Sequence, residues 1–438
     1  MSFVQTVTLF VFGTIGIVAV ILFANFAGSK GVGYLGDVEL WGTTSAELVA
    51  PIIKKVNDDN KKLFNLVYKE KRANTFDAEL VSALASGKGP DLFLIPSREI
   101  VRESNKIAKI AYEKLSERQF KDTFVDESSL FLTDGGILAL PFYSDPLIMY
   151  WNKDILSSSG VPAAPKKWSE FLDIAEKITV SSRIGNITQA TVAMGGYRNV
   201  LNAKEILATL FMQAGDPIVK RDTSEKRSTG PIAIDQTFAE DPGIVPSGVR
   251  FYNSFSNPAN KNYSWNSELP ISKNAFQSGI LGIYFGFASD YNQIKLANPH
   301  LNFDVGPVPQ RDLAQTRITY GELYGLAIAK NTKNFGGAFA VVNTLTGVDA
   351  SKAWSDALYL PSARRDILQD GTRDGVMSVF YNSAIMARSW LDPDPEETGA
   401  IFKELIESIL SGVKTEESAT KSAGVEMATL ITRVTKSL

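Results

Sequence analysis

Cysteine is absent from the 438 residues of this chain, and histidine occurs only once. The lack of cysteine excludes disulfide bonds, thiolate metal sites, cysteine nucleophiles and lipid attachment at an N-terminal cysteine. A zinc site with several histidines is impossible, and a Ser-His-Asp triad would have to use His300. Because His300 follows Asn298 and Pro299, we expect it in a solvated turn. We expect no metal site, and no cofactor is expected either.

The chain also has no excess of positive charge. Its 45 Lys and Arg residues stand against 48 Asp and Glu residues, and the formal net charge is −3. Binding to a phosphate backbone needs a basic surface, so nucleic acid is not expected as a partner. Hydrophobic residues (44%) and charged residues (21%) are at ordinary globular levels. The length favours two or three domains with a core that needs no disulfide or metal.

One stretch, residues 4–27, contains no charged residue at all. A transmembrane helix needs about 20 mostly apolar residues, which this stretch supplies. A cleaved signal peptide usually begins with a basic side chain and ends in a small-x-small site, and neither feature is present. Both alternatives stay open, and we favour an uncleaved helix. We expect residues 1–36 to form a membrane anchor and a flexible, glycine-rich tether.

The segment after the tether alternates between two kinds of pattern. Short apolar runs at 38–41, 63–68 and 91–95 indicate strands, and apolar residues at helical spacing between them indicate helices. Such an order predicts a parallel sheet with right-handed crossovers. Ligands bind beyond the carboxyl ends of strands in sheets of this type. Residues 42–45 and 96–98 are therefore placed at a candidate site.

Further strands are expected along the rest of the chain. Two strand-like runs within 137–152 flank the proline-containing stretch 141–146, and a helix begins after Trp168. Residues 221–247 are polar and rich in turn formers, which indicates a loop or an irregular insert. Strands are also expected at 280–287, 303–309 and 325–329, and the chain from Phe335 onward is expected to be mainly helical.

Four motifs in a fixed order resemble one known family. They are Ser86–Ile95 (SGKGPDLFLI), 140–179 (beginning LPFYSDPLIMYWNKDI), Asn274–Phe287 (NAFQSGILGIYFGF) and Ile409–Ala419 (ILSGVKTEESA). Together they resemble the extracellular solute-binding proteins of ABC importers, specifically the sugar-binding group that includes maltose-binding protein. The resemblance extends from residue 37 to about residue 425. No single motif is specific, but their order is.

The resemblance implies an α/β, periplasmic-binding-protein-like fold. Two α/β lobes would be joined by a multi-strand hinge and preceded by one N-terminal transmembrane helix. We expect the chain to cross between lobes near 140–145, 276–280 and 330–335. The stretches 221–247 and 390–395 match no family pattern and leave the ligand open. The expected division is 1–36 for the anchor and tether, 37–140 plus 281–330 for lobe 1, and 141–280 plus 331–438 for lobe 2.

The resemblance also implies a function. Such a protein is a receptor on the extracytoplasmic side of the cell membrane, here expected to be single-pass. It would capture a small ligand, expected to be a sugar, and deliver it to the permease subunits of an ABC importer without catalysis, as a monomer. One alternative is a glycoside-acting enzyme, which would need two carboxylates about 5–10 Å apart. The other is a ligand-sensing ectodomain.

A neutral sugar needs aromatic platforms for its C–H faces and carboxylates or amides for its hydroxyls. Each candidate has a purely structural alternative: helix capping for the residues after the first strand, hinge packing for those near 143 and 324, a salt bridge for the glutamate, and core packing for the phenylalanines and the tryptophan. We expect Trp265 in particular to stack on the ligand. The expected ligand-binding residues are Thr43, Ser45, Tyr143, Asp145, Trp265, Phe285, Phe287, Glu322 and Tyr324.

Overall fold

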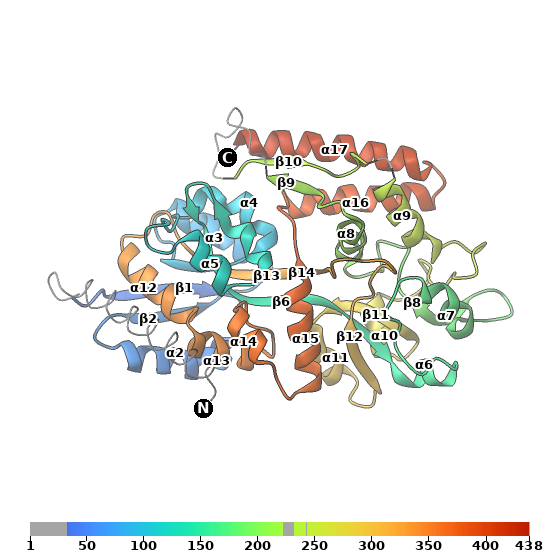
Figure 1. The fold of residues 1–438 in the computed structure, drawn as a ribbon, viewed down its shortest axis with the longest axis horizontal. Coiled ribbons are helices and arrows are strands. Elements are labelled where there is room, and N and C mark those ends of the chain that lie inside the picture. The colour runs from blue at the N-terminus through green and yellow to red at the C-terminus, as the bar shows by residue number, and fades with distance from the viewer. Residues whose placement is uncertain (1–32, 222–231, 242, 438) are drawn as a thin grey trace, which may run out of the picture.

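A computed structural model describes residues 33–221, 232–241 and 243–437 (Figure 1). One ten-stranded sheet has the order β2-β1-β3-β13-β6-β11-β8-β7, with β12 added to β6 and β14 added to β13. Two long strands, β6 (Ala139–Asn152) and β13 (Thr319–Ile328), run through the middle of this sheet. Figure 1 shows that β6 extends into both halves of the molecule, and this continuity links two lobes.

The first lobe is built on three parallel strands. β1 (Asp37–Gly42) pairs with β2 (Asn65–Glu70) on one side and with β3 (Leu92–Pro96) on the other. The predicted strand–helix–strand–helix–strand order is confirmed here, with each strand within two or three residues of its expected bounds. The other elements of this lobe are α2 (Ala46–Asn60), α3 (Phe76–Ala85), α4 (Ile100–Glu103), α5 (Glu117–Thr123), β4 (Leu132–Thr133), β5 (Gly136–Ile137), α12 (Phe335–Leu345), α13 (Val348–Leu358) and α14 (Arg365–Asp370).

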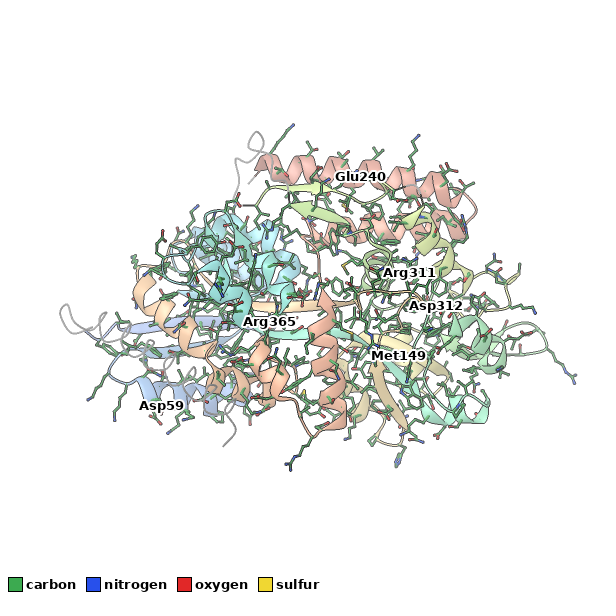
Figure 2. All side chains as sticks on the ribbon, viewed as in Figure 1. Asp59, Met149, Glu240, Arg311, Asp312 and Arg365 are labelled. Carbon is green, nitrogen blue, oxygen red and sulfur yellow. The ribbon has the colours of Figure 1, made fainter. Side chains whose placement is uncertain are left out.

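The second lobe is built around the distal half of β6. β11 (Leu281–Phe287) and β12 (Phe303–Pro307) both pair antiparallel with β6, and β11 pairs parallel with β8 (Ile187–Val192). Figure 2 shows Asp59 near the end of α2 in the first lobe and Met149 on β6 in the second. The other elements are α6 (Lys153–Ser158), α7 (Glu170–Ile178), β7 (Val180–Ser181), α8 (Ala203–Ala214), β9 (Val219–Arg221), β10 (Ile234–Gln236), α9 (Ile244–Ser254), α10 (Ser272–Gln277), α11 (Asp290–Ala297), α16 (Pro395–Leu410) and α17 (Glu416–Ser437).

The expected lobe division, 37–140 plus 281–330 and 141–280 plus 331–438, needs correction in its later segments. β11 and β12 pair with β6 and β8, so residues 281–307 lie in the second lobe. α12 and α13 pack on β1, β13 and α2, so residues 335–358 lie in the first. The reason is physical: a strand buried on both faces is apolar throughout, and its composition does not specify which neighbour it pairs with.

Two of the three crossings between the lobes therefore lie at other positions than expected. The first lies in β6, as expected near 140–145. The second lies in β13, whose start contacts α8 and whose end pairs with β3, rather than near 276–280. The third lies between α14 and α16 rather than near 330–335. Here α15 (Gly375–Met386) and β14 (Ala387–Arg388) run along the boundary between the two lobes, which we call the seam. Figure 1 shows α15 standing between the two halves.

β6 is one strand, not the two runs that its prolines indicated. Its pairing with β13 shifts register where Tyr143 faces Tyr324 and Pro141 faces Gly325, which leaves Phe142 as an extra residue. Such a bulge bends the strand and accommodates a proline, which has no amide hydrogen to donate. The strand therefore continues through the expected break and carries the chain from one lobe to the other.

Two expectations fall wholly or partly outside the described residues. The apolar stretch 4–27, expected as a transmembrane anchor, is one of them. In the described part of the chain, no helix is both long and apolar enough to cross a bilayer. Within 221–247, residues 222–231 and 242 are also outside the description. The flanking residues form the β9–β10 hairpin and the start of α9, so these flanks are more regular than expected.

Candidate functional site

Four of the expected site residues meet where β6 and β13 cross between the lobes. Tyr143 is paired with Tyr324, and Asp145 with Glu322, in the antiparallel register. Side chains directly opposite each other, and those two residues apart on one strand, share a face of the sheet. The rings of Tyr143 and Tyr324 are stacked with centroids 4.7 Å apart. This face therefore presents two aromatic rings and two carboxyl groups.

Glu322 is the most heavily hydrogen-bonded of the four. Its carboxylate accepts from the Ser97 hydroxyl (3.0 Å), from the Arg98 backbone amide (3.1 Å) and from the Arg98 guanidinium. Ser97 and Arg98 begin the 3₁₀ turn Ser97–Glu99 directly after β3, the strand end where a site was expected. Glu322 is 3% exposed, so its ion pair with Arg98 is buried on the side of the carboxylate. The pair is part of the seam.

The turn that follows β1 is held by a tyrosine of the neighbouring strand β2. The Tyr68 hydroxyl donates to the Thr44 carbonyl (2.7 Å), and burial raises the pKa of Tyr68 to about 12. Thr43 is half-buried beside this carbonyl, and Ser45 is exposed at the N-cap of α2. The Ser45 side chain makes no capping hydrogen bond, so the helix-capping alternative does not apply to it.

Asp145 faces the second lobe. Its Oδ1 accepts from the Ser289 backbone amide at 3.0 Å, just after β11. The pKa of Asp145 is raised to about 7, mainly by burial; the charges of Asp290 and Glu322 contribute to the rise, and the hydrogen bond from Ser289 opposes it. Asp290 itself is paired with Lys273 (2.6 Å) and accepts from the Tyr284 hydroxyl (2.8 Å). The second-lobe side of the seam is thus rich in carboxyl groups whose partners are already fixed.

Two of the remaining expected residues do not join this cluster as ligand platforms, and the role of a third, Phe287, stays a prediction. Trp265 is 0% exposed, and its indole nitrogen donates to the Asn199 side chain at 3.0 Å, so no ring face is free. Phe285 is also fully buried, and its ring lies 5.4 Å from that of Trp168 in the core. Phe287 is half-buried against the Tyr320 ring. The first two expectations are therefore corrected: both residues are core residues.

Two residues of the seam were not expected by name. Arg98 lies within residues 96–98, which were expected at the site, and the only feature of the sequence that indicates it is its position after a buried strand. Glu205 lies in the first turn of α8, half-buried. Burial raises the pKa of Glu205, with Glu322 adding to this effect and Lys204 and Arg98 opposing it. The charges of the first lobe thus act on a glutamate of the second.

No group of three or more His, Asp or Glu residues suited to a metal ion occurs in the described ranges. A separate hollow of about 1190 Å³ lies in the second lobe between the starts of α7 and α9 and the loop that follows β12. Figure 2 labels Arg311 and Asp312 of that loop, and none of the expected site residues lines the hollow.

Comparison with known proteins agrees with this architecture. Residues 45–352 match the family model described as bacterial extracellular solute-binding protein. The chain belongs to this family. A putative binding protein of Brucella abortus (strain 2308) is 24% identical over 371 residues, which cover 80% of this chain and 81% of that protein. A 50-residue segment is 44% identical to the sn-glycerol-3-phosphate-binding periplasmic protein of Agrobacterium fabrum and covers 11% of this chain and 12% of that protein.

Solved structures of the family share the fold. A cyclic α-maltosyl-1,6-maltose binding protein from Arthrobacter globiformis superposes with a TM-score of 0.73 at 13% identity, over 91% of this chain and 99% of that one. A Staphylococcus aureus extracellular solute-binding protein in complex with maltose gives 0.69 at 16% identity, over 91% and 98%. The two-lobed α/β fold expected from the sequence is confirmed by these likenesses.

Proposed function

We propose that this solute-binding protein is the ligand-capturing receptor of an ABC importer and that it encloses a carbohydrate between its lobes. The observation that carries the proposal is the cluster at the seam: the stacked Tyr143 and Tyr324 rings beside the hydrogen-bonded Glu322 carboxylate. Aromatic faces match the C–H faces of a sugar, and carboxylates match its hydroxyls. The solved relatives named for maltose and for a maltosyl-maltose also support a carbohydrate.

The proposal includes attachment to the membrane. Residues 4–27 are uncharged and long enough to span a bilayer, so we propose a single-pass anchor with the lobes on the extracytoplasmic side. A monomeric receptor would then diffuse in the membrane plane and meet the permease subunits there. Intact-mass measurement on native membranes tests the anchor. A mass that matches cleavage after Ala27, together with a soluble protein, would contradict it.

A glycoside-acting enzyme is the second candidate, because the seam carries several carboxyl groups. Glu322 and Asp145 are directly opposite on neighbouring strands, yet Glu322 is engaged by Ser97 and Arg98, and Asp145 accepts from Ser289. An inverting or retaining enzyme needs one carboxylate free to attack or to activate water. These fixed partners favour binding over catalysis. A ligand-sensing ectodomain would share the same lobes and differ only in its partner.

The test uses the full chain in detergent with a panel of neutral oligosaccharides that includes maltose. We expect at least one sugar to raise the melting temperature and to contract the molecule in small-angle scattering, with no turnover by chromatography of the sugar. Free ligand at about 100 times its dissociation constant stabilises a protein by about 2.7 kcal/mol, which a melting scan detects easily. Hydrolysis of the stabilising sugar would instead favour the enzyme.

A further inference from the structure

The loops at one edge of the first-lobe sheet carry a group of exposed lysines. β1, β2 and β3 are parallel, and β13 runs antiparallel to β3 and ends beside the start of β3. The loops before β2 and β3 and the loop after β13 therefore lie at the same edge, and Figure 1 shows β1 and β2 running from this outer end toward the seam. We call this surface the lysine edge, and its exposed lysines are Lys61, Lys62, Lys88, Lys330 and Lys333.

The charge of the lysine edge is not neutralised by the described part of the chain. None of the five lysines forms an ion pair with a described residue. In the loops that carry them, residues 61–64, 86–91 and 329–334, the one carboxylate is Asp91, whose oxygens accept from the Glu39 amide (3.0 Å) and the Thr332 hydroxyl (2.5 Å). Asp37, at the start of β1, accepts from the Asn65 side chain at 3.0 Å. Both nearby carboxylates thus have other partners.

The chain enters the first lobe through this edge. The Leu35 amide donates to the Leu63 carbonyl at 2.7 Å, and the Leu35 carbonyl accepts from the Asn334 side chain at 2.7 Å. Leu63 directly follows Lys62, and Asn334 directly follows Lys333. Each contact that fixes Leu35 therefore has an exposed lysine next to it, and the lysine edge surrounds the point where the tether meets the lobe.

The tether is short enough to keep this edge near a bilayer. In the proposed anchor the apolar stretch ends at Ala27, and residues 28–34 connect it to Leu35. A fully extended chain spans at most about 3.6 Å per residue, so Leu35 lies within about 30 Å of the end of the apolar stretch. Lys30 is the one charged residue of this connection, and it is also basic. The lysine edge is thus the surface that the tether holds nearest to the lipid headgroups.

We propose that the lysine edge binds the anionic phospholipid headgroups of the membrane that holds the anchor, and that this contact orients the first lobe on the bilayer. A lysine close to an anionic lipid surface strengthens binding about fivefold, and the attraction decays within a Debye length of about 8 Å. The carboxyl ends of the same strands carry the ligand cluster, a strand length of about 20 Å away, so this contact leaves the seam free. The inference rests on the proposed membrane anchor and adds a second contact to it.

The absence of cysteine allows a single dye to be placed at a chosen site. The full chain carries either Asn331→Cys, an exposed position in the loop between Lys330 and Lys333, or Ser418→Cys, an exposed position on α17 of the second lobe. Each labelled chain is reconstituted into vesicles of phosphatidylcholine alone or of equal parts phosphatidylcholine and phosphatidylglycerol. Energy transfer from the dye to headgroup-linked acceptors measures how closely each lobe approaches the lipid.

Two charge variants with the same loss of positive charge are compared. The edge variant replaces the five lysines of the lysine edge by glutamine. Melting temperatures with and without the stabilising sugar show whether each variant is folded and binds ligand. The control variant replaces five exposed lysines of the second lobe that also lack an ion pair with a described residue, namely Lys166, Lys177, Lys261, Lys403 and Lys421.

We expect energy transfer from the Asn331 position to be about twofold greater in the anionic vesicles than in the neutral ones, with a smaller change at Ser418. About 0.5 M salt and the edge variant should each abolish the difference, whereas the control variant should keep it. Equal transfer in both lipids, or a difference that survives in the edge variant, overturns the inference while the anchor stands. Transfer that grows with the density of protein in the vesicle assigns the edge to a second copy instead. A chain that floats with neither kind of vesicle refutes the anchor and the inference together.

Discussion

Arg98 and Glu322 are 224 positions apart in the chain and form an ion pair at the seam between the lobes. Arg98 follows β3, and Glu322 lies on β13, the strand that carries the chain back to the first lobe. The Arg98 side chain is 42% exposed, whereas the Glu322 side chain is 4% exposed. The pair therefore joins a buried acceptor to a cation that still reaches solvent, and the two residues respond differently to substitution.

The first prediction is that Arg98→Ala destabilises the unliganded protein by about 2–4 kcal/mol, because it leaves the Glu322 carboxylate buried with only neutral donors. Chemical denaturation of the full chain measures the free energy of unfolding. Arg118→Ala is the control: its pair with Asp122 is 91% and 71% exposed, and such pairs are worth about 0–1 kcal/mol. Equal effects of the two substitutions would show that Glu322 tolerates the loss of its cation.

The second prediction concerns the tyrosine stack. Tyr324→Ala removes a ring that packs on Tyr143 and faces the seam. We expect ligand affinity to fall about 10-fold, because the sugar loses the apolar contact of its C–H face with this ring. Tyr324→Phe keeps the ring and should retain most of the affinity. Calorimetry with the stabilising sugar measures both. Unchanged affinity in Tyr324→Ala would remove the stack from the site.

Trp265 gives the third prediction, which replaces the expected role in ligand stacking. Because the ring is fully buried, Trp265→Ala should cost about 3–5 kcal/mol of folding stability. The affinity of the protein that remains folded should be near that of wild type. Paired melting and binding measurements on the same variant test this. A large loss of affinity at an unchanged melting temperature would return Trp265 to the ligand site.

The segment around Trp265 explains why sequence alone was misleading. Its polar neighbours indicated exposure, but the structure buries Asn262 and Ser264 and satisfies their side chains internally. The Ser264 hydroxyl donates to the Val192 carbonyl at 2.9 Å, and the backbone amides of Ser264 and Trp265 both donate to the Phe255 carbonyl. A polar segment is expected to form hydrogen bonds, but its composition does not indicate whether the partner is water or another part of the protein. Both water and a buried backbone carbonyl can accept the hydrogen bond that a polar side chain donates.

The first lobe was more predictable for a related reason. Between 38 and 95, each strand is short, apolar and bounded by turn formers, and each helix has its own periodicity, so local information is enough. The crossing strand β13 shows the limit. The strand was expected at 325–329, after Glu322 and Tyr324, whereas β13 begins at Thr319. Nothing local identified Arg98 or Tyr143 as neighbours of Glu322 and Tyr324. Long-range pairing is a property of the folded sheet.

The fourth prediction is a pH dependence of stability caused by Glu127. This residue is 2% exposed on the 3₁₀ helix Asp126–Phe131, and its carboxyl packs against Gly321 of β13, where neither oxygen has a hydrogen-bond partner. Burial raises its pKa to about 8, with Glu322 adding to the effect and Arg388 opposing it. The unfolded carboxyl ionises near 4.5.

A raised pKa in the folded state means that Glu127 supports stability fully below pH 4.5 and that this support is lost between pH 4.5 and about 8. Glu127→Gln cannot ionise, so we expect it to be more stable than wild type by about 1–3 kcal/mol at pH 8 and little changed at pH 4.5. Denaturant titrations across this range measure the difference. Exposed Glu268→Gln is the control. Parallel pH profiles for Glu127→Gln and wild type would refute the prediction.

The last prediction concerns a second contact between the lobes, which involves none of the expected ligand-binding residues. Arg221, at the end of β9 in the second lobe, donates to the carbonyls of Ser129 (3.1 Å) and Leu130 (2.8 Å) in the first lobe. Both acceptors lie on the same 3₁₀ helix as Glu127. These charge-assisted hydrogen bonds exist only while the lobes are together, and each is of the stronger class.

Arg221→Ala should therefore shift the unliganded population toward open lobes. Losing about 1.5–3 kcal/mol of closed-state stabilisation lowers the population of the closed form and weakens ligand affinity about 10- to 100-fold, although no ligand contact is removed. Small-angle scattering should give a larger unliganded radius of gyration that contracts to the wild-type value at saturation. Arg433→Ala is the control, because its exposed pair with Glu397 lies within the second lobe. If Arg221→Ala scatters and binds as the wild type does, the contact does not hold the lobes together, and closure must depend on the seam alone.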